Sequence, residues 1–181
     1  MKHVCLALLC LLCAACARFE HPIVAESGPR FDDALAGHWM IESEEGLFEM
    51  DIRRAGDEGL VVLTSTKKGE APETDTARLI TARLERQTFA SVAGVTADSN
   101  WLLFRYEFAT PDRLVIYQDD DEFWDQAVNN RLIASRSDQD PDPKVRNATI
   151  TASSDELRAF VLGYGGVIFK DQPAATFTRT P

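Results

Sequence analysis

Ala36-Gly37-His38-Trp39 stands where a polar segment stops and alternating, strand-like sequence begins. Gly37 has no Cβ, and Trp39, two positions later, carries an indole large enough to plug the end of a barrel. Such a pair is typical of the start of a β-barrel. It predicts a fold and does not indicate a chemical activity.

Downstream of this stretch, polar and apolar residues alternate with the two-residue period of β-strands. The first run places Phe48, Met50 and Ile52 on one face, and residues 55–59 supply the turn into a returning strand. Hairpins are expected over three segments, 48–66, 80–92 and 102–118. The last is the clearest.

The third hairpin contains a run of large apolar side chains at period two. Leu102, Phe104, Tyr106 and Phe108 fall on one face of the expected strand, and Pro111-Asp112 makes the turn. Four such groups must face a core. They either line a cavity or fill the barrel completely, as side chains do in many small barrels.

An amphipathic helix is expected over about residues 121–133. Asp119-Asp120-Asp121-Glu122 opens it, because negative charge near a helix N-terminus stabilises the helix by ~0.3–1 kcal/mol. A metal site built from these acids is the alternative, but capping explains them without a ligand. The apolar side is expected to comprise Phe123, Trp124, Ala127, Val128 and Leu132.

A second amphipathic helix is expected over about residues 154–164. Ser153 and Glu156 have the spacing of a capping box, and Gly165-Gly166 is expected to end the helix. A last strand over 174–178 then closes the domain. The predicted fold class is mainly β, an antiparallel meander barrel or half-barrel with these two helices.

The Gly37-x-Trp39 start, the meander of hairpins and the late helix before a final strand resemble the lipocalin-like barrels, some of which are outer-membrane lipoproteins. The resemblance covers roughly residues 31–181. It implies a cavity for a small apolar molecule or an acyl chain, with Trp39, Phe104, Tyr106 and Phe108 as candidate ligand-binding residues. A half-open barrel, such as that of the outer-membrane lipoprotein-carrier chaperones, is the alternative architecture.

Residues 1–15 have the pattern of an export signal peptide: a short basic start, an apolar run and small residues before a cysteine. Leu12-Cys13-Ala14-Ala15-Cys16 resembles the lipobox of bacterial lipoproteins, which implies cleavage before Cys16 and acylation of its thiol, with the membrane as partner. Ala17 resembles the pattern that sorts such proteins to the outer membrane. Cleavage after Ala15-Cys16-Ala17 would instead release a soluble periplasmic protein. We expect residues 16–30 to form a lipidated N-terminus and tether.

Composition limits the remaining function classes. All four cysteines lie within the first sixteen residues, so the body of the domain has no thiol for catalysis or for metal binding. The formal charge of −10 argues against nucleic acid or an anionic membrane surface as an electrostatic partner. We find no catalytic constellation and expect no enzyme activity and no cofactor; His38, the one domain histidine, is expected beside the barrel end.

One spacing invites a calcium site. Asp138, Asp140 and Asp142 form a D-x-D-x-D pattern. Pro143 stands where the calcium loop needs glycine, and Thr149 stands where it needs a bidentate glutamate. We therefore expect no metal there. The hypotheses that remain are a membrane-anchored binding protein and a structural or envelope-assembly lipoprotein without a ligand.

Overall fold

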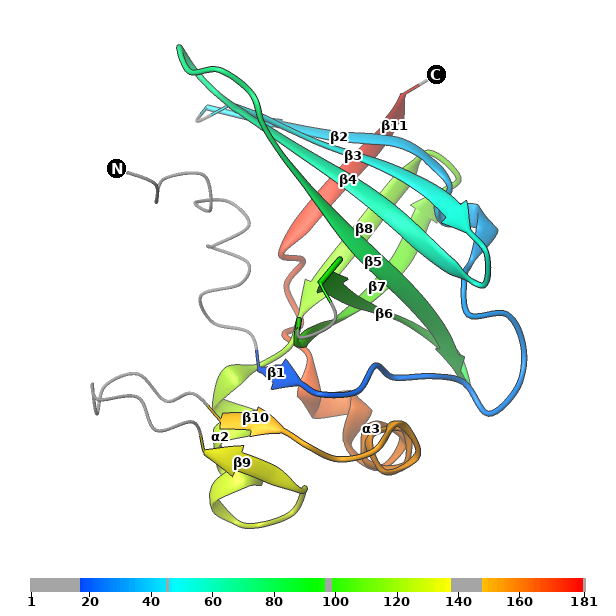
Figure 1. The fold of residues 1–181 in the computed structure, drawn as a ribbon, viewed down its shortest axis with the longest axis vertical. Helices are drawn as coiled ribbons and strands as arrows, with labels where there is room; N and C mark the ends of the chain where they lie inside the picture. Colours follow the sequence, from blue (N-terminus) through cyan, green and yellow to red (C-terminus); the bar gives the residue numbers. More distant parts are fainter. Residues whose placement is uncertain (1–16, 45, 97–98, 138–147, 181) are drawn as a thin grey trace.

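The computed structural model describes residues 17–44, 46–96, 99–137 and 148–180. Eight antiparallel strands form a barrel, which closes where the strand Gln87–Gly94 pairs with the strand Trp101–Thr110 (Figure 1). The barrel strands are β2 (Gly37–Ser43), β3 (Gly46–Ala55), β4 (Glu58–Lys67), β5 (Glu73–Leu84), β6 (Gln87–Gly94), β7 (Trp101–Thr110), β8 (Arg113–Gln118) and β11 (Ala175–Thr180). The prediction of a mainly β fold is confirmed. Of the two expected architectures, a barrel and a half-barrel, the structure has the closed barrel.

The inner face of the barrel follows the alternation in the sequence. Phe48, Met50 and Ile52 of β3 are buried, whereas Asp51 and Arg53 between and after them are exposed. The apolar residues of this strand therefore enter the interior and the charged ones face water. All three expected hairpins are present.

Trp39 closes one end of the barrel. Its side chain is 0% exposed and donates its indole N–H to the carbonyl oxygen of Leu35 at 2.8 Å. Leu35 belongs to a short 3-10 helix, η1 (Asp33–Leu35), that crosses this end. The guanidinium carbon of Arg179 in the last strand lies 4.4 Å from the centre of the Trp39 ring. Gly37 takes a φ of 138°, which L side chains rarely adopt, so the glycine is required where the chain enters β2.

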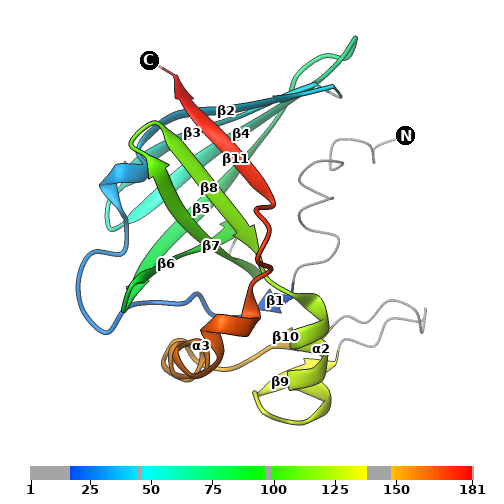
Figure 2. The same cartoon turned by 180° about the vertical axis from the view of Figure 1, so that it is seen from behind.

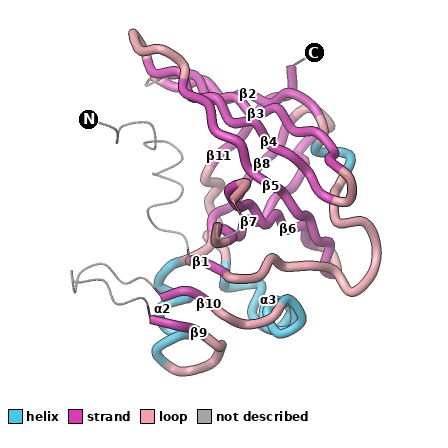
Figure 3. The backbone as a smooth tube through the Cα atoms, in the orientation of Figure 1, coloured by secondary structure: helices cyan, strands magenta, loops and turns pink. Residues whose placement is uncertain are grey.

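A second core lies outside the barrel, against the outer face of its β5–β8 wall (Figure 2). Two helices, α2 (Asp121–Asn129) and α3 (Ser154–Ile168), cover it together with the short strands β1 (Arg18–Phe19), β9 (Ser135–Ser137) and β10 (Ala148–Ile150). Figure 3 shows both helices gathered on this one side of the barrel. The wall strands therefore carry apolar residues on both faces, as Leu103 toward the helices and Phe104 toward the interior show.

Helix α2 is shorter than expected. It ends at Asn129, and Arg131 takes a φ of 56°, so the chain turns away before Leu132 can join the apolar side. Leu132 is 52% exposed, and its expected place on that side is wrong. The acids at the start do cap the helix: the carboxylate of Asp120 accepts the backbone N–H of Glu122 at 3.1 Å.

Helix α3 is longer than expected. The capping box of Ser153 and Glu156 is present, but the helix continues through Gly165-Gly166 to Ile168. Ile168 is fully buried in the second core, and its carbonyl oxygen accepts the N–H of Asp120 at 2.7 Å. These contacts hold the helix beyond the point at which two glycines were expected to end it. Within the described residues, no helix combines the length and the apolar character needed to cross a membrane.

The expected tether is part of the folded body. Phe19 and Ile23 are 1% and 0% exposed, and β1 pairs with β7 on one side and with β10 on the other. The N–H of Ile23 donates to the hydroxyl oxygen of Ser91 at 3.0 Å. The boundary that we expected at residue 31 is therefore wrong, because these two apolar side chains fill the second core.

Replacing Phe19 by alanine tests this boundary. We expect Phe19→Ala to lower the free energy of unfolding by about 3 kcal/mol, because it leaves a cavity beside the ring of Trp124. His21→Ala, two residues away at an exposed position, should change it by less than ~0.5 kcal/mol. Urea unfolding of both variants makes the measurement, and equal small effects would mean that the segment is a free tether.

Candidate ligand-binding cavity

The barrel interior contains a cavity of about 90 Å³. Seven barrel strands and η1 contribute to its wall, and every lining residue is apolar or aromatic. The lining residues are Leu35, Phe48, Met50, Ile52, Val61, Leu63, Leu79, Ala90, Val92, Phe104, Tyr106, Leu114, Ile116 and Phe177. The interior is thus largely filled by side chains but not completely.

The four candidate residues separate into two groups. Phe104 and Tyr106 line the cavity. Trp39 and Phe108 do not; they pack against each other at the closed end, with ring centres 5.9 Å apart. Phe108 also contacts Tyr106 edge to face, at 6.0 Å between ring centres. Trp39 and Phe108 therefore support the cavity from the closed end without forming its wall.

Among the side chains that line the cavity, the only nitrogen or oxygen atom is the hydroxyl oxygen of Tyr106, and the surface that faces the cavity is apolar. This hydroxyl donates to the carboxylate of Asp32 at 2.9 Å. Burial, followed by the negative charge of Asp32, raises the pKa of Tyr106 above its ordinary value of 10.0. The hydroxyl thus remains neutral and committed to Asp32, which leaves the cavity an apolar surface.

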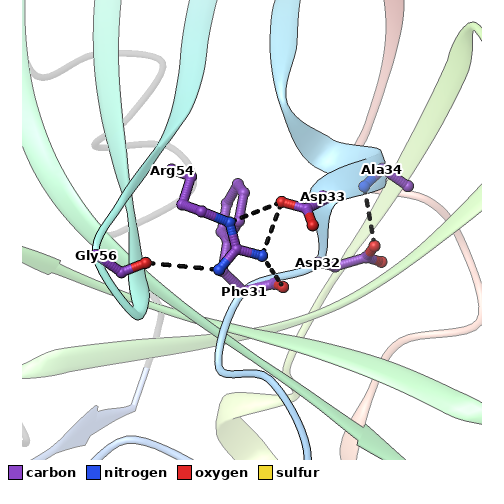
Figure 4. Close-up of polar contacts among 6 residues, drawn as sticks. All are labelled: Phe31, Asp32, Asp33, Ala34, Arg54 and Gly56. Atoms are coloured by element: carbon purple, nitrogen blue, oxygen red, sulfur yellow. Dashed lines mark hydrogen bonds and ion pairs between the residues drawn. The ribbon is translucent and has the colours of Figure 1, made fainter.

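Asp32 is held in place by the turn that forms η1. Its other carboxylate oxygen accepts the backbone N–H of Ala34 at 3.0 Å, which caps the short helix (Figure 4). Beside it, Arg54 of β3 donates to the carboxylate of Asp33 at 2.8 Å and to the carbonyl oxygen of Phe31 at 3.4 Å. The closed end is therefore fastened by polar contacts outside the apolar plug.

The cavity opens toward the opposite end of the barrel. Three lining residues are partly exposed, Val92, Phe104 and Ile116, and the others are buried. Phe104 pairs with Gln118, the last residue of β8, so the three side chains lie where β8 leaves the barrel. We call this end, at Val92, Phe104 and Ile116, the open rim.

The volume and the chemistry of the cavity limit what can enter it. Pockets for drug-sized ligands measure about 300–1,000 Å³, whereas an apolar cavity of ~150 Å³ stays dry and binds benzene. A cavity of about 90 Å³ therefore suits a narrow apolar group rather than a large rigid ligand. With no charged side chain among its lining residues, it offers nothing to balance a buried charge.

Other residues considered in the sequence lie away from the cavity. The ring of His38 is on the outside of β2, with its Nε2 atom 3.2 Å from the carboxylate of Glu49. Among the described residues, no three His, Cys, Asp or Glu side chains are grouped so that they could hold a metal ion. Cys16 and the D-x-D-x-D pattern of Asp138, Asp140 and Asp142 lie outside the described residues.

Sequence reasoning missed Asp32 and Leu35. The tyrosine hydroxyl and the Asp32 carboxylate are separated by 74 residues in the chain, so no local period connects them. Leu35 joins the wall only because η1 folds across the barrel end. The one local signal is the spacing of Phe31 and Leu35, which lie four residues apart, as on one face of a helical turn, just before Gly37.

Comparison with protein families, curated proteins and solved structures found no match for this chain.

The hydrogen bond of Tyr106 predicts a dependence of stability on pH. Since the pKa is raised in the folded protein, the folded state holds the phenolic proton more tightly than the unfolded chain. The resulting stabilisation is fully present below the unfolded pKa of 10.0 and is lost as the pH rises from there toward the folded pKa.

We therefore expect Tyr106→Phe to cost about 1 kcal/mol at neutral pH and to lose less stability than the native chain above pH ~10. Tyr164→Phe, an exposed position on α3, is the control and should follow the native curve. Urea unfolding between neutral and alkaline pH measures both. Parallel curves for Tyr106→Phe and the native chain would contradict the assignment.

Proposed function

We propose that this protein is a bacterial envelope lipoprotein whose barrel binds a small apolar ligand or an acyl chain. The observation that carries the proposal is the apolar cavity of about 90 Å³ that opens at one end of the barrel. Its only polar wall group, the Tyr106 hydroxyl, already has a partner in Asp32. The surface left for a ligand is therefore one that favours contact with hydrocarbon.

The proposed role is binding rather than catalysis. A general acid or base must reach the reacting atoms with a titratable group of suitable pKa. The wall supplies only the tyrosine hydroxyl, and burial beside Asp32 moves the pKa of Tyr106 further from neutral pH. The interior is thus better suited to holding an apolar group than to proton transfer.

The membrane anchor is proposed from the sequence alone. The apolar run before Cys16 and the small residues Ala14 and Ala15 support acylation of that cysteine. Several acyl chains bind a bilayer far more firmly than one, at ~0.8 kcal/mol per buried methylene. With Ala17 after the cysteine, the proposed location is the outer membrane, facing the periplasm. Release as a soluble periplasmic protein is the alternative.

A structural or envelope-assembly lipoprotein without a ligand is the second candidate. The observation that favours it is that the cavity is well below the ~300 Å³ at which drug-sized pockets begin. Under this proposal the space is a packing defect in a barrel that serves as a rigid body. Lipid extraction and native mass spectrometry of the purified protein separate the two candidates, because only the binding protein carries a copurified apolar molecule.

Filling the open rim tests ligand binding directly. We expect Val92→Phe to weaken binding of parinaric acid, a straight-chain fluorescent fatty acid, by about tenfold or more, equivalent to ~1.4 kcal/mol. Val167→Phe makes the same change at an exposed position on α3, outside the cavity wall, and should bind like the native chain. Fluorescence titration measures both. Absence of binding to the native chain, or equal binding to the two variants, would argue against the proposal.

Cys16→Ser tests the anchor. We expect the native protein in the membrane fraction of the producing bacterium and the serine variant outside it, because a hydroxyl cannot take the thioether-linked lipid. Cys13→Ser, three residues earlier, is the matched control and should remain in the membrane fraction. Fractionation followed by immunoblotting gives the result, and retention of Cys16→Ser in the membrane would remove the lipoprotein proposal.

A further inference from the structure

The folded body begins almost at the proposed lipid attachment site. Arg18 is the first residue of β1, and Cys16 precedes it by two residues. An extended chain spans at most ~3.6 Å per residue, so the Cys16 and Arg18 Cα atoms can be no more than about 7 Å apart. Without the spacer that the sequence led us to expect, the anchor would hold the body directly against the membrane.

Strand β1 lies at the open end of the barrel. Phe19 pairs with Trp101, the first residue of β7. The next residue, Leu102, pairs with Val92 of the open rim, and Phe104 follows two residues later. Figures 1 and 2, seen from opposite sides, both place β1 away from the barrel end that η1 covers. The chain therefore leaves the body beside the open rim.

An apolar side chain lies exposed beside the open rim. Val95, directly after β6, is 56% exposed. Charged residues are exposed at both ends of the barrel, among them Arg54 and Asp57 at the closed end and Glu44 and Glu70 in the turns at the open end. The orientation of the barrel is therefore inferred from where the chain leaves the body, and Val95 gives the open side an apolar group to place at a membrane interface.

We propose that the open rim, with Val95, is a membrane-contact surface through which an acyl chain passes between the bilayer and the cavity. This inference rests on the proposed acylation of Cys16 and the proposed binding function. It adds the direction in which the barrel faces and the source of its ligand. The closed end with Trp39 and η1 points away from the bilayer.

Chemical anchoring makes this orientation testable without bacterial processing. In the chain from Cys16 to Pro181, which contains every described residue, Cys16 is the only thiol, because the other cysteines are at positions 5, 10 and 13. It can be coupled to a maleimide phospholipid in phosphatidylcholine vesicles. Such neutral vesicles avoid repulsion of this acidic protein. Lipids brominated along their chains then quench tryptophans that touch the bilayer.

Two substitutions to tryptophan at exposed positions test which end of the barrel contacts the bilayer. Val95→Trp places the probe at the open rim and Asp57→Trp at the closed end, on the same background of three native tryptophans. The added fluorescence is the difference between each variant and the native chain. We expect Val95→Trp to lose most of its added fluorescence in brominated vesicles and Asp57→Trp to keep its own.

Equal quenching of both variants, or stronger quenching of Asp57→Trp, would overturn the proposed orientation. Parinaric acid binding in solution, without vesicles, tests the cavity separately. If the rim is quenched but the native chain binds no parinaric acid in solution, the contact surface stands while passage of an acyl chain and the binding function are refuted. If the acid binds but the rim is not quenched, the binding function stands and the membrane-contact surface is refuted.

Discussion

Burial of both faces of the β5–β8 wall is the constraint on which the rest of this structure depends. A barrel strand usually alternates between an apolar interior and a wet exterior. Here Leu79 faces the barrel core while Ile80, its neighbour, faces the second core. Leaving such outer residues in water would cost the hydrophobic stabilisation of each side chain, about 1.5–3 kcal/mol. The helices and residues 18–24 are therefore integral parts of one folded body.

Elements specified by local sequence were predictable. The alternation around Phe48 and Phe104, the capping box at Ser153 and the Gly37-x-Trp39 start each depend on residues a few positions apart. Barrel closure, the pairing of β1 with β7 and the extension of α3 through Gly165-Gly166 depend instead on residues far apart in the chain. A single sequence contains the apolar residues that drive these contacts but not their partners, which is why Phe19 and Ile23 were assigned to a tether.

The candidate site was predictable to the same extent. Period two placed Phe104, Tyr106 and Phe108 on one face of β7, and all three belong to the barrel core or pack against it. The two-residue period does not tell how far along the barrel axis each side chain lies. Successive inward residues descend toward the closed end, so Phe104 and Tyr106 line the cavity while Phe108 packs on Trp39. The hydrogen bond to Asp32 similarly requires η1 to cross the barrel end.

The polarity of the cavity also determines how a ligand would lie in it. An ionised headgroup buried without a partner loses its hydration, a cost that no apolar wall can offset. The Tyr106 hydroxyl supplies no compensating donor, since its proton is directed at Asp32. A fatty acid would therefore insert its hydrocarbon end toward Tyr106 and leave its carboxylate beyond the open rim, in contact with water or lipid headgroups. That arrangement requires only a narrow cavity, because one end of one chain enters it. The small volume is thus compatible with binding of an acyl chain, even though it is too small for a whole lipid.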